Sequence, residues 1–312
     1  MKWIVDRYFG RQLWIMTLML AGIAITLSAC EKEFDIDVKA NKPQLIVEAY
    51  ISNLLPEYNY VVLSRSQDYF EPNFQAMPVK GAKVTITEGE WISGNSYSWD
   101  TVNRVTLQEV SLPGMPSNFQ SGVYIDPLLI ANPSQALTGK VGKHYLLEIT
   151  EGGRYYYSIT EILPTVKIDS LTADYPFYDE EDKRWEKRLT VHYKDPDTIG
   201  NVQFYYWRFS ENRNNFGWGG IARSRSQGPD DLTNGQVMHI THTMGMPVGD
   251  TVDYYLASLT RDVYNFWDSY IKARSNGGPY STPVVLKSTM HGKDVIGCFT
   301  GQSIDHRRII IP

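Results

Sequence analysis

Apolar and polar residues alternate with a period of two through much of this 312-residue chain. In Leu45–Ile51 every second residue is apolar, and Pro78–Glu88 alternates in the same way. Successive side chains of a strand point to opposite faces, so this period indicates strands with one buried face. The pattern therefore predicts a mainly β protein, with further strands at Tyr60–Arg65, Tyr145–Thr150, Tyr155–Ile162, Leu189–Tyr193, Val202–Phe209, Val237–His242 and Val252–Leu259.

Glycine and proline separate these strands at short intervals, which is typical of an immunoglobulin-like β-sandwich. Glu151–Arg154 predicts a four-residue hairpin loop. Pro164 and the polar run after it mark a boundary. We therefore expect two immunoglobulin-like or β-sandwich domains, an N-terminal one over residues 43–164 and a C-terminal, β-rich one over residues 165–312.

The period changes from two to about 3.6 near the C-terminus. Apolar side chains recur there at i, i+3, i+4, i+7 and i+8, as on one face of a helix: Val263, Phe266, Trp267, Tyr270 and Ile271. The spacing predicts one helix over residues 262–275, with Asp262 as its N-cap and Gly277 just beyond its end. We expect its aromatic stripe, including Trp267, to pack against a sheet.

Composition excludes several classes of protein. Hydrophobic residues make up 42% of the chain, enough to bury a core. A net charge of −5 argues against nucleic-acid binding, which usually requires a basic surface. With only two cysteines, Cys30 and Cys298, a disulfide framework or a multi-cysteine zinc site is excluded.

The N-terminus carries the pattern of an exported protein. Lys2, Arg7 and Arg11 precede an apolar run from Leu13 to Leu27, which is shorter than the roughly twenty residues of a membrane-spanning helix. Leu27-Ser28-Ala29-Cys30 resembles the lipobox of bacterial lipoproteins, in which the cysteine is acylated. We expect residues 1–29 to be a lipoprotein signal peptide and residues 30–42 a lipidated tether, anchored in outer-membrane lipid through Cys30.

Acidic residues follow the lipidation site in Glu31-Lys32-Glu33-Phe34-Asp35. This cluster resembles a signal with which some Gram-negative bacteria send lipoproteins to the cell surface. A solvated tether on the periplasmic face is the alternative. We expect an outer-membrane lipoprotein exposed at the cell surface.

The sequence offers no arrangement typical of an enzyme. No histidine lies in a protease signature, and no G-x-S-x-G motif occurs. His239 and His242 are three apart in a predicted strand, which puts them on opposite faces and makes a shared metal ion improbable. Asp179–Asp182 lacks the ligand spacing of a calcium loop, and Cys298 is expected to be a buried core thiol. We expect no catalytic residue, no metal and no cofactor.

The segment from Asn212 to Asp231 is the candidate binding loop. It is long for a connection within a sandwich, and long loops are often functional. It combines aromatic with basic side chains among glycines, in Phe216, Trp218, Arg223 and Arg225. The alternative is a loop whose aromatic side chains fold back onto the sheet.

Several segments follow one another in a characteristic order: the lipobox, LIVEAYI, PVKGAKVTIT, YLLEITEGGRYYYS, YLASLTRDVYNFW and NGGPYSTPVVLKSTMHGKDVIGCF. From about Pro43 to Phe299 the chain resembles the lipoproteins of the family called domain of unknown function 4249. The resemblance implies an outer-membrane lipoprotein encoded beside a TonB-dependent receptor, and it implies no activity.

Two functions fit these observations. The first is a non-enzymatic accessory lipoprotein, the partner of a TonB-dependent barrel in nutrient uptake or barrel function. The second is a stand-alone surface adhesin or glycan-binding module that uses exposed tryptophan and tyrosine. The oligomeric state cannot be predicted.

Overall fold

The described part of the chain is built mainly from β-strands. The computed structural model describes residues 42–54, 56–67, 77–111, 122–209, 225–226, 228–229, 231, 233–276, 282 and 284–312. The strands are β1 (Leu45–Ser52), β2 (Tyr60–Arg65), β3 (Lys83–Ser93), β4 (Ser96–Trp99), β5 (Val105–Val110), β6 (Val123–Ile125), β7 (His144–Glu151), β8 (Arg154–Glu161), β9 (Ile168–Asp179), β10 (Arg184–Lys194), β11 (Asn201–Phe209), β12 (Arg225–Ser226), β13 (Val237–Pro247), β14 (Thr251–Thr260) and β15 (Val295–Ile310).

Helical structure in these residues is limited to one long helix and three short turns. The long helix is α3 (Arg261–Ser275), and the turns are η1 (Pro56–Tyr58), α2 (Leu128–Ala131) and η3 (Pro133–Gln135). The predicted helix over residues 262–275 is therefore confirmed. Its N-cap is Thr260 rather than Asp262, which lies in the first turn. Gly277 lies outside the described residues. No helix in the described ranges is long and apolar enough to cross a membrane.

The strands form two sheets, so the predicted sandwich-like, mainly β fold is confirmed. The larger sheet has the strand order β12-β11-β14-β15-β1-β2-β6-β5-β3-β7-β8, with β4 paired to β3, and the smaller one has the order β13-β10-β9. The larger sheet curls, because β8 returns to β15, where the Gly301 amide donates to Thr160 Oγ1 at 2.9 Å. The immunoglobulin-like topology stays a prediction.

The first core lies inside this curl. Alternate residues of β1 point into it, among them Leu45, Val47 and Ile51, as the period-two pattern predicts. Phe299 of β15 lies in the same core, although it is far away in the sequence. Parallel pairing of β1 with β15, from Leu45↔Val295 to Ser52↔Gln302, brings it there.

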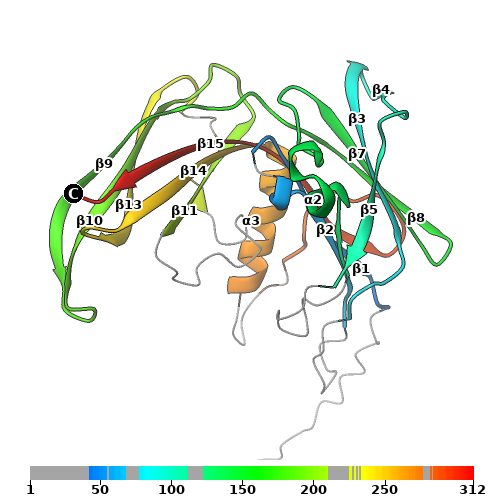
Figure 1. The fold of residues 1–312 in the computed structure, drawn as a ribbon, viewed down its shortest axis with the longest axis horizontal. Helices are drawn as coiled ribbons and strands as arrows, with labels where there is room; N and C mark the ends of the chain where they lie inside the picture. Colours follow the sequence, from blue (N-terminus) through cyan, green and yellow to red (C-terminus); the bar gives the residue numbers. More distant parts are fainter. Residues whose placement is uncertain are drawn as a thin grey trace, which may run out of the picture. The chain divides into compact units, whose positions relative to one another are not determined.

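Two more cores lie on either side of β14. Tyr255, Ala257 and Leu259 face α3, which packs against β11, β14 and β15 (Figure 1). The alternate residues, which include Tyr254 and Leu256, face the small sheet. β14 is thus buried on both faces, and every residue from Val252 to Leu259 is buried.

The strand β15 joins the two halves of the sequence. It pairs with β1 from the first half and with β14 from the second (Figure 1). Residues Asn41–Pro312 form one compact unit. The division into domains at residues 164 and 165 stays a prediction.

A partly buried carboxyl group lies under α3. Glu48 is on the same face of β1 as Tyr50, whose hydroxyl donates to Glu48 Oε1 at 2.5 Å. Burial raises the pKa of the Glu48 carboxyl above its ordinary value, although the hydrogen bond from Tyr50 opposes this shift. At neutral pH the ionised form of Glu48 therefore costs folding free energy.

We expect Glu48→Gln to stabilise the protein at neutral pH, because the amide oxygen still accepts from Tyr50 and nothing ionises. The pKa of Glu48 is higher in the folded chain than in the unfolded chain. The contribution of Glu48 to the stability of the fold is therefore fully present below its unfolded-state pKa. It is lost as the pH rises through its folded-state pKa. Thermal melts should show a gain of about 1–3 °C at neutral pH. The gain should vanish below about pH 4. Glu57→Gln, at an exposed carboxyl, is the control. An equal rise in melting temperature in both variants would contradict the conclusion that burial of the Glu48 carboxyl causes the effect.

Candidate binding site

A cavity of about 490 Å³ opens where the end of β8, the first turn of α3 and the segment before β15 meet. This volume is in the range of small-molecule sites, roughly 300–1,000 Å³. Its polar walls include Glu161, His144, Asp262, Asn265, Lys287 and His291. We call it the polar cavity. These residues come from four separate elements of the chain.

The first wall is the outward face of the β7–β8 hairpin. In β8 the residues Tyr156, Ser158 and Thr160 are buried, so Ile159 and Glu161 point outward into the polar cavity. Glu161 pairs in register with His144 of β7. Glu161 Oε2 lies 3.7 Å from His144 Nε2, too far for a hydrogen bond.

The second wall is the N-terminal turn of α3. The chain passes from β14 into the helix at Thr260, and burial of Val263 holds the first turn in place. Asp262 and Asn265 are three residues apart, so they lie on one side of this turn. Both line the polar cavity, beside the positive end of the helix dipole.

The third wall is the segment from Lys287 to His291. The Lys287 amide donates to Ser269 Oγ of α3 at 3.0 Å. At the other end of the segment, His291 and Tyr157 exchange backbone hydrogen bonds of 2.8 and 3.0 Å. The ring of His291 stacks on that of Tyr157, with centroids 4.8 Å apart. The segment therefore bridges α3 and β8.

Polar groups in these walls are not used by the fold. In the described part of the chain, the side chains of Asp262, Asn265 and Lys287 make no hydrogen bond or ion pair, and His144 Nδ1 is buried without a partner. Asp262 and Lys287 are exposed, so water can satisfy their side chains, whereas a buried group such as His144 Nδ1 normally has a partner. The unpaired His144 nitrogen makes the polar cavity a candidate ligand site.

The hydroxyl groups in the cavity walls, in contrast, form hydrogen bonds with the backbone. Ser288 Oγ donates to the Gly297 carbonyl at 3.0 Å and accepts from the amides of Gly297 and Met290 at 3.1 Å. Thr289 Oγ1 accepts from the Phe299 amide at 3.1 Å. These hydroxyls position the wall, and the groups left for a ligand are carboxyl, amide, amino and imidazole groups.

A second cavity, of about 540 Å³, shares Glu161 and Thr260 with the polar cavity. Its walls are mainly apolar and include Leu163, Pro164, Val166, Pro196 and Ile199. The two together match a ligand that has a polar and an apolar part.

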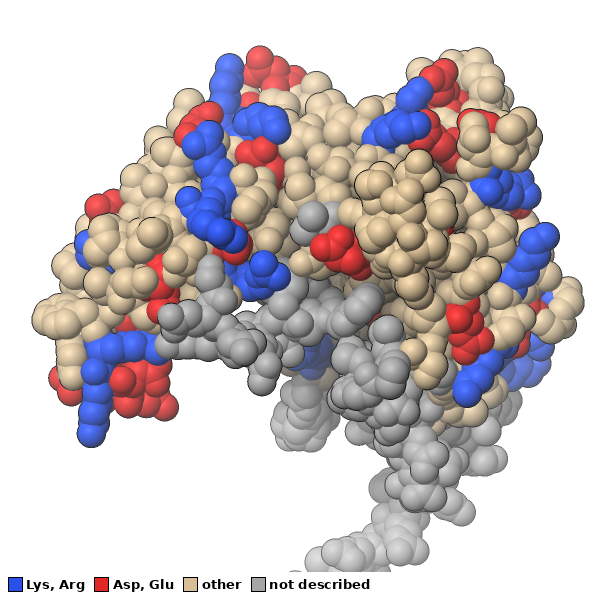
Figure 2. Space-filling view, viewed as in Figure 1, with Lys and Arg blue, Asp and Glu red and all other residues tan. Residues whose placement is uncertain are grey.

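On the described surface of the face drawn in Figure 2, both basic and acidic side chains occur.

Most of the sequence-predicted site residues lie outside the described residues. These are Cys30, Phe216, Trp218 and Arg223. Arg225 is in β12, where its backbone pairs with Tyr205 of β11. The anchor at Cys30 and the binding loop 212–231 stay predictions.

The two strand histidines point to opposite faces, as predicted. His242 is buried, with Nε2 2.7 Å from the Tyr254 hydroxyl, whereas His239 is exposed. Cys298 is 1% exposed, so the prediction of a buried thiol is confirmed as well. Burial raises the pKa of the Cys298 thiol to about 12, which makes it a poor nucleophile.

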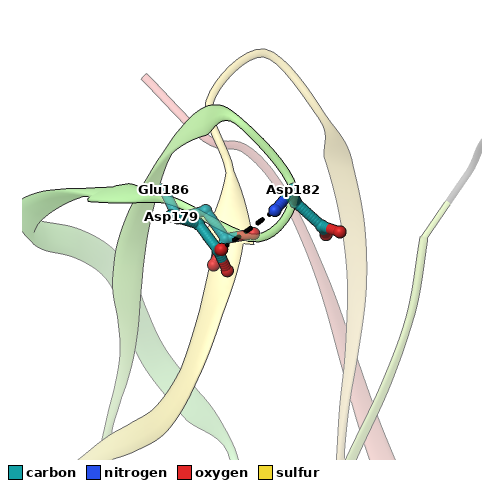
Figure 3. Close-up of side chains that lie close together, drawn as sticks. All are labelled: Asp179, Asp182 and Glu186. Carbon is teal, nitrogen blue, oxygen red and sulfur yellow. Dashed lines mark hydrogen bonds between the residues drawn. The ribbon is translucent and has the colours of Figure 1, made fainter.

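The acidic run at Asp179–Asp182 forms a hairpin turn. Asp179 Oδ1 accepts from the amides of Glu181 and Asp182, and carboxylate atoms of Asp179, Asp182 and Glu186 lie within 4.8 Å of one another (Figure 3). Arg184 already pairs with Asp182 at 2.6 Å and with Glu186 at 2.8 Å. Arg184 thus offsets part of the negative charge of this cluster. Glu180–Asp182 are exposed, as predicted for a solvated acidic loop.

Sequence reasoning missed the polar cavity because its residues are scattered along the chain. One signal was available: Lys287 and His291 lie in the tail segment that carries much of the family resemblance. Their role depends on packing beside β8 and α3, which no local pattern encodes.

A family model described as "Domain of unknown function (DUF4249)" matches residues 31–308. The match contains every residue of the polar cavity. A search of curated proteins gives no match. The association with TonB-dependent receptors stays a prediction. Since the match covers nearly the whole chain beyond Cys30, the protein belongs to the DUF4249 family.

Proposed function

We propose that this protein is a lipid-anchored binding protein of the outer membrane, which takes a ligand into the polar cavity and works with a TonB-dependent barrel in nutrient uptake. The lipobox at Cys30 supports the anchor, and the acidic residues after it support display at the cell surface. The family membership supports the barrel partner through the resemblance described above.

One observation carries the binding function. His144 Nδ1 is buried without a hydrogen-bond partner in the wall of the polar cavity, where the side chains of Asp262, Asn265 and Lys287 also converge. Buried polar groups normally have partners, so a ligand in the cavity would complete the hydrogen bonds of His144.

Binding without catalysis fits the chemistry of the walls. A hydrolase of the serine type needs a free hydroxyl beside a base. The hydroxyls of Ser288 and Thr289 are held by backbone groups of β15 and of its approach. The carboxyl, amino and imidazole groups that remain are suited to recognising a zwitterionic or multiply hydroxylated molecule.

A glycan-binding module is the second candidate, and one feature favours it. The rings of Tyr155 and Tyr157 stack at 6.0 Å and continue to His291 at the edge of the polar cavity. Both tyrosines are exposed, at 52% and 36%. Exposed aromatic rings beside polar groups are a common surface for sugars.

The test uses the full chain, with Cys30 intact, purified from outer membranes in mild detergent. We expect a TonB-dependent barrel to co-elute in a stoichiometric amount. The same preparation is then screened by thermal shift against free amino acids, short peptides and oligosaccharides. A ligand of the polar cavity should lose its shift in Lys287→Met and in Asp262→Asn, whereas Lys293→Met, outside the cavity walls, serves as the control.

Each part can fail by itself. Oligosaccharide binding without a barrel would replace the accessory function by the glycan-binding one. A thermal shift that both cavity variants retain in full would place the ligand elsewhere and refute the role of the polar cavity.

A further inference from the structure

Two histidines face each other across neighbouring strands of the small sheet. His192 of β10 and His239 of β13 are directly paired in the antiparallel register. Their Nδ1 atoms are 2.6 Å apart, and the ring centroids are 4.8 Å apart with an interplanar angle of 64°. His239 is exposed and His192 is half-buried, so the pair is open to solvent.

A hydroxyl on the third strand orients one of these rings. Thr172 Oγ1 of β9 lies 3.0 Å from His192 Nε2. When Nε2 donates to this oxygen, the Nδ1 lone pair of His192 is directed at His239. Histidines that bind metals usually have such a partner on the second ring nitrogen, since it fixes both ring orientation and tautomer.

The backbone under the pair is held firmly. β10 is the central strand of the small sheet, with β9 and β13 on either side. The neighbours of His192, Val191 and Tyr193, point inward and are 0% and 2% exposed. The two imidazoles therefore lie on the outer face of a sheet whose central strand is paired on both sides, with a register irregularity between His192 and Tyr193 in the pairing with β9.

We infer that His192 and His239 form a surface site for a divalent transition-metal ion such as Zn²⁺, with water completing its coordination. Zn²⁺ binds imidazole nitrogen at about 2.0–2.1 Å, which in a tetrahedral site separates two such nitrogens by about 3.3 Å. A small outward rotation of the rings from the observed 2.6 Å is enough. The entering ion displaces the proton through which His239 Nδ1 donates to His192 Nδ1, and Nε2 of the exposed His239 takes up a proton from solvent in exchange, so both rings bind the ion as neutral imidazoles.

The donor set distinguishes this site from the acidic turn at Asp179–Glu186. Imidazole selects Zn²⁺, Ni²⁺ and Cu²⁺, whereas Ca²⁺ and Mg²⁺ require oxygen ligands. The site departs from the sequence-based expectation of no metal, because His239 is close in sequence to His242 but meets His192 only through the register of the sheet. It does not depend on the proposed ligand of the polar cavity.

Calorimetric titration of the purified full chain with ZnCl₂ tests the inference. We expect one binding event that weakens by at least about tenfold in His192→Ala and in His239→Ala. Thr172→Val should weaken it less, since Thr172 only positions His192. Lys194→Gln, an exposed substitution in the same strand, should leave it unchanged. CaCl₂ should give no heat that depends on either histidine.

A spectroscopic readout separates ligation from indirect effects. In the Cu²⁺-loaded protein, electron paramagnetic resonance should show coupling to two imidazole nitrogens, and to one in each alanine variant. Circular dichroism checks that the variants remain folded, which their outer-face positions favour. The inference is overturned if both alanine variants bind Zn²⁺ like the unchanged chain, or if that chain takes up none at millimolar ZnCl₂.

Discussion

Gly297→Ala is expected to destabilise the protein by more than about 4 kcal/mol, among the largest effects of a single substitution. Gly297 pairs with Val47 where β15 runs parallel to β1. A Cβ atom added there would overlap the carbonyl oxygen of Val47 and lie 2.7 Å from its carbonyl carbon. The residue also has φ +150°, a conformation that glycine adopts and alanine avoids. Relief requires β1 and β15 to separate, which would open the first core.

A second glycine serves as a control that separates the steric overlap at Gly297 from the effect of a positive φ. Gly81 has φ +68°, and a Cβ there meets no atom within 4 Å. Gly81→Ala should cost only about 1–2 kcal/mol, the penalty of the left-handed conformation. Urea unfolding followed by circular dichroism compares the two variants. Equal midpoints would show that β1 and β15 are not held in contact through Gly297.

Several of the strands that the sequence predicts have one buried and one exposed face. β8 is an example: Tyr156, Ser158 and Thr160 are buried while Tyr155 and Tyr157 are exposed. β2 was predicted to the residue, at Tyr60–Arg65. In such strands a single core decides the pattern, so local alternation carries the information.

The longest strand of the structure, β15, was missed for the opposite reason. Residues Gly297–Ile304 are buried on both faces, between the first core and the core under α3. Several of them are small or polar, such as Gly301, Gln302 and Ser303, so no alternation appears. Their burial depends on elements that lie hundreds of residues away in the sequence. A short stretch of sequence around β15 therefore does not show that these residues are buried.

Both proposed sites depend on this kind of long-range information. The polar cavity requires β8 to lie beside α3 and Lys287–His291. In the metal site, His192 and His239 are 47 residues apart and meet only through strand register. Residue type suggested histidines as metal ligands, but only the strand register of the folded sheet shows that His192 lies opposite His239. The binding loop 212–231 was predicted from its length and composition and remains a prediction.

Trp267→Ala is expected to cost about 3–5 kcal/mol, as for other buried aromatic residues. Trp267 is 3% exposed and packs between α3 and the large sheet, where its ring stacks on Tyr50 with centroids 6.1 Å apart. Its Nε1–H donates to Thr300 Oγ1 of β15 at 3.0 Å. Truncation would leave a cavity and remove the hydrogen bond that Thr300 Oγ1 accepts. Trp267→Phe keeps most of the volume and should cost less, about 1–2 kcal/mol for the lost hydrogen bond.

Trp185 provides the control, because it is the same residue type at 57% exposure in β10. Trp185→Ala should change the free energy of unfolding by less than about 1 kcal/mol. Urea titrations of the three variants give the comparison, and similar losses at Trp267 and Trp185 would refute the packing of α3 described here. The result also bears on function. α3 supplies Asp262 and Asn265 to the polar cavity, so loosening its contact with β15 should weaken ligand binding even in molecules that remain folded.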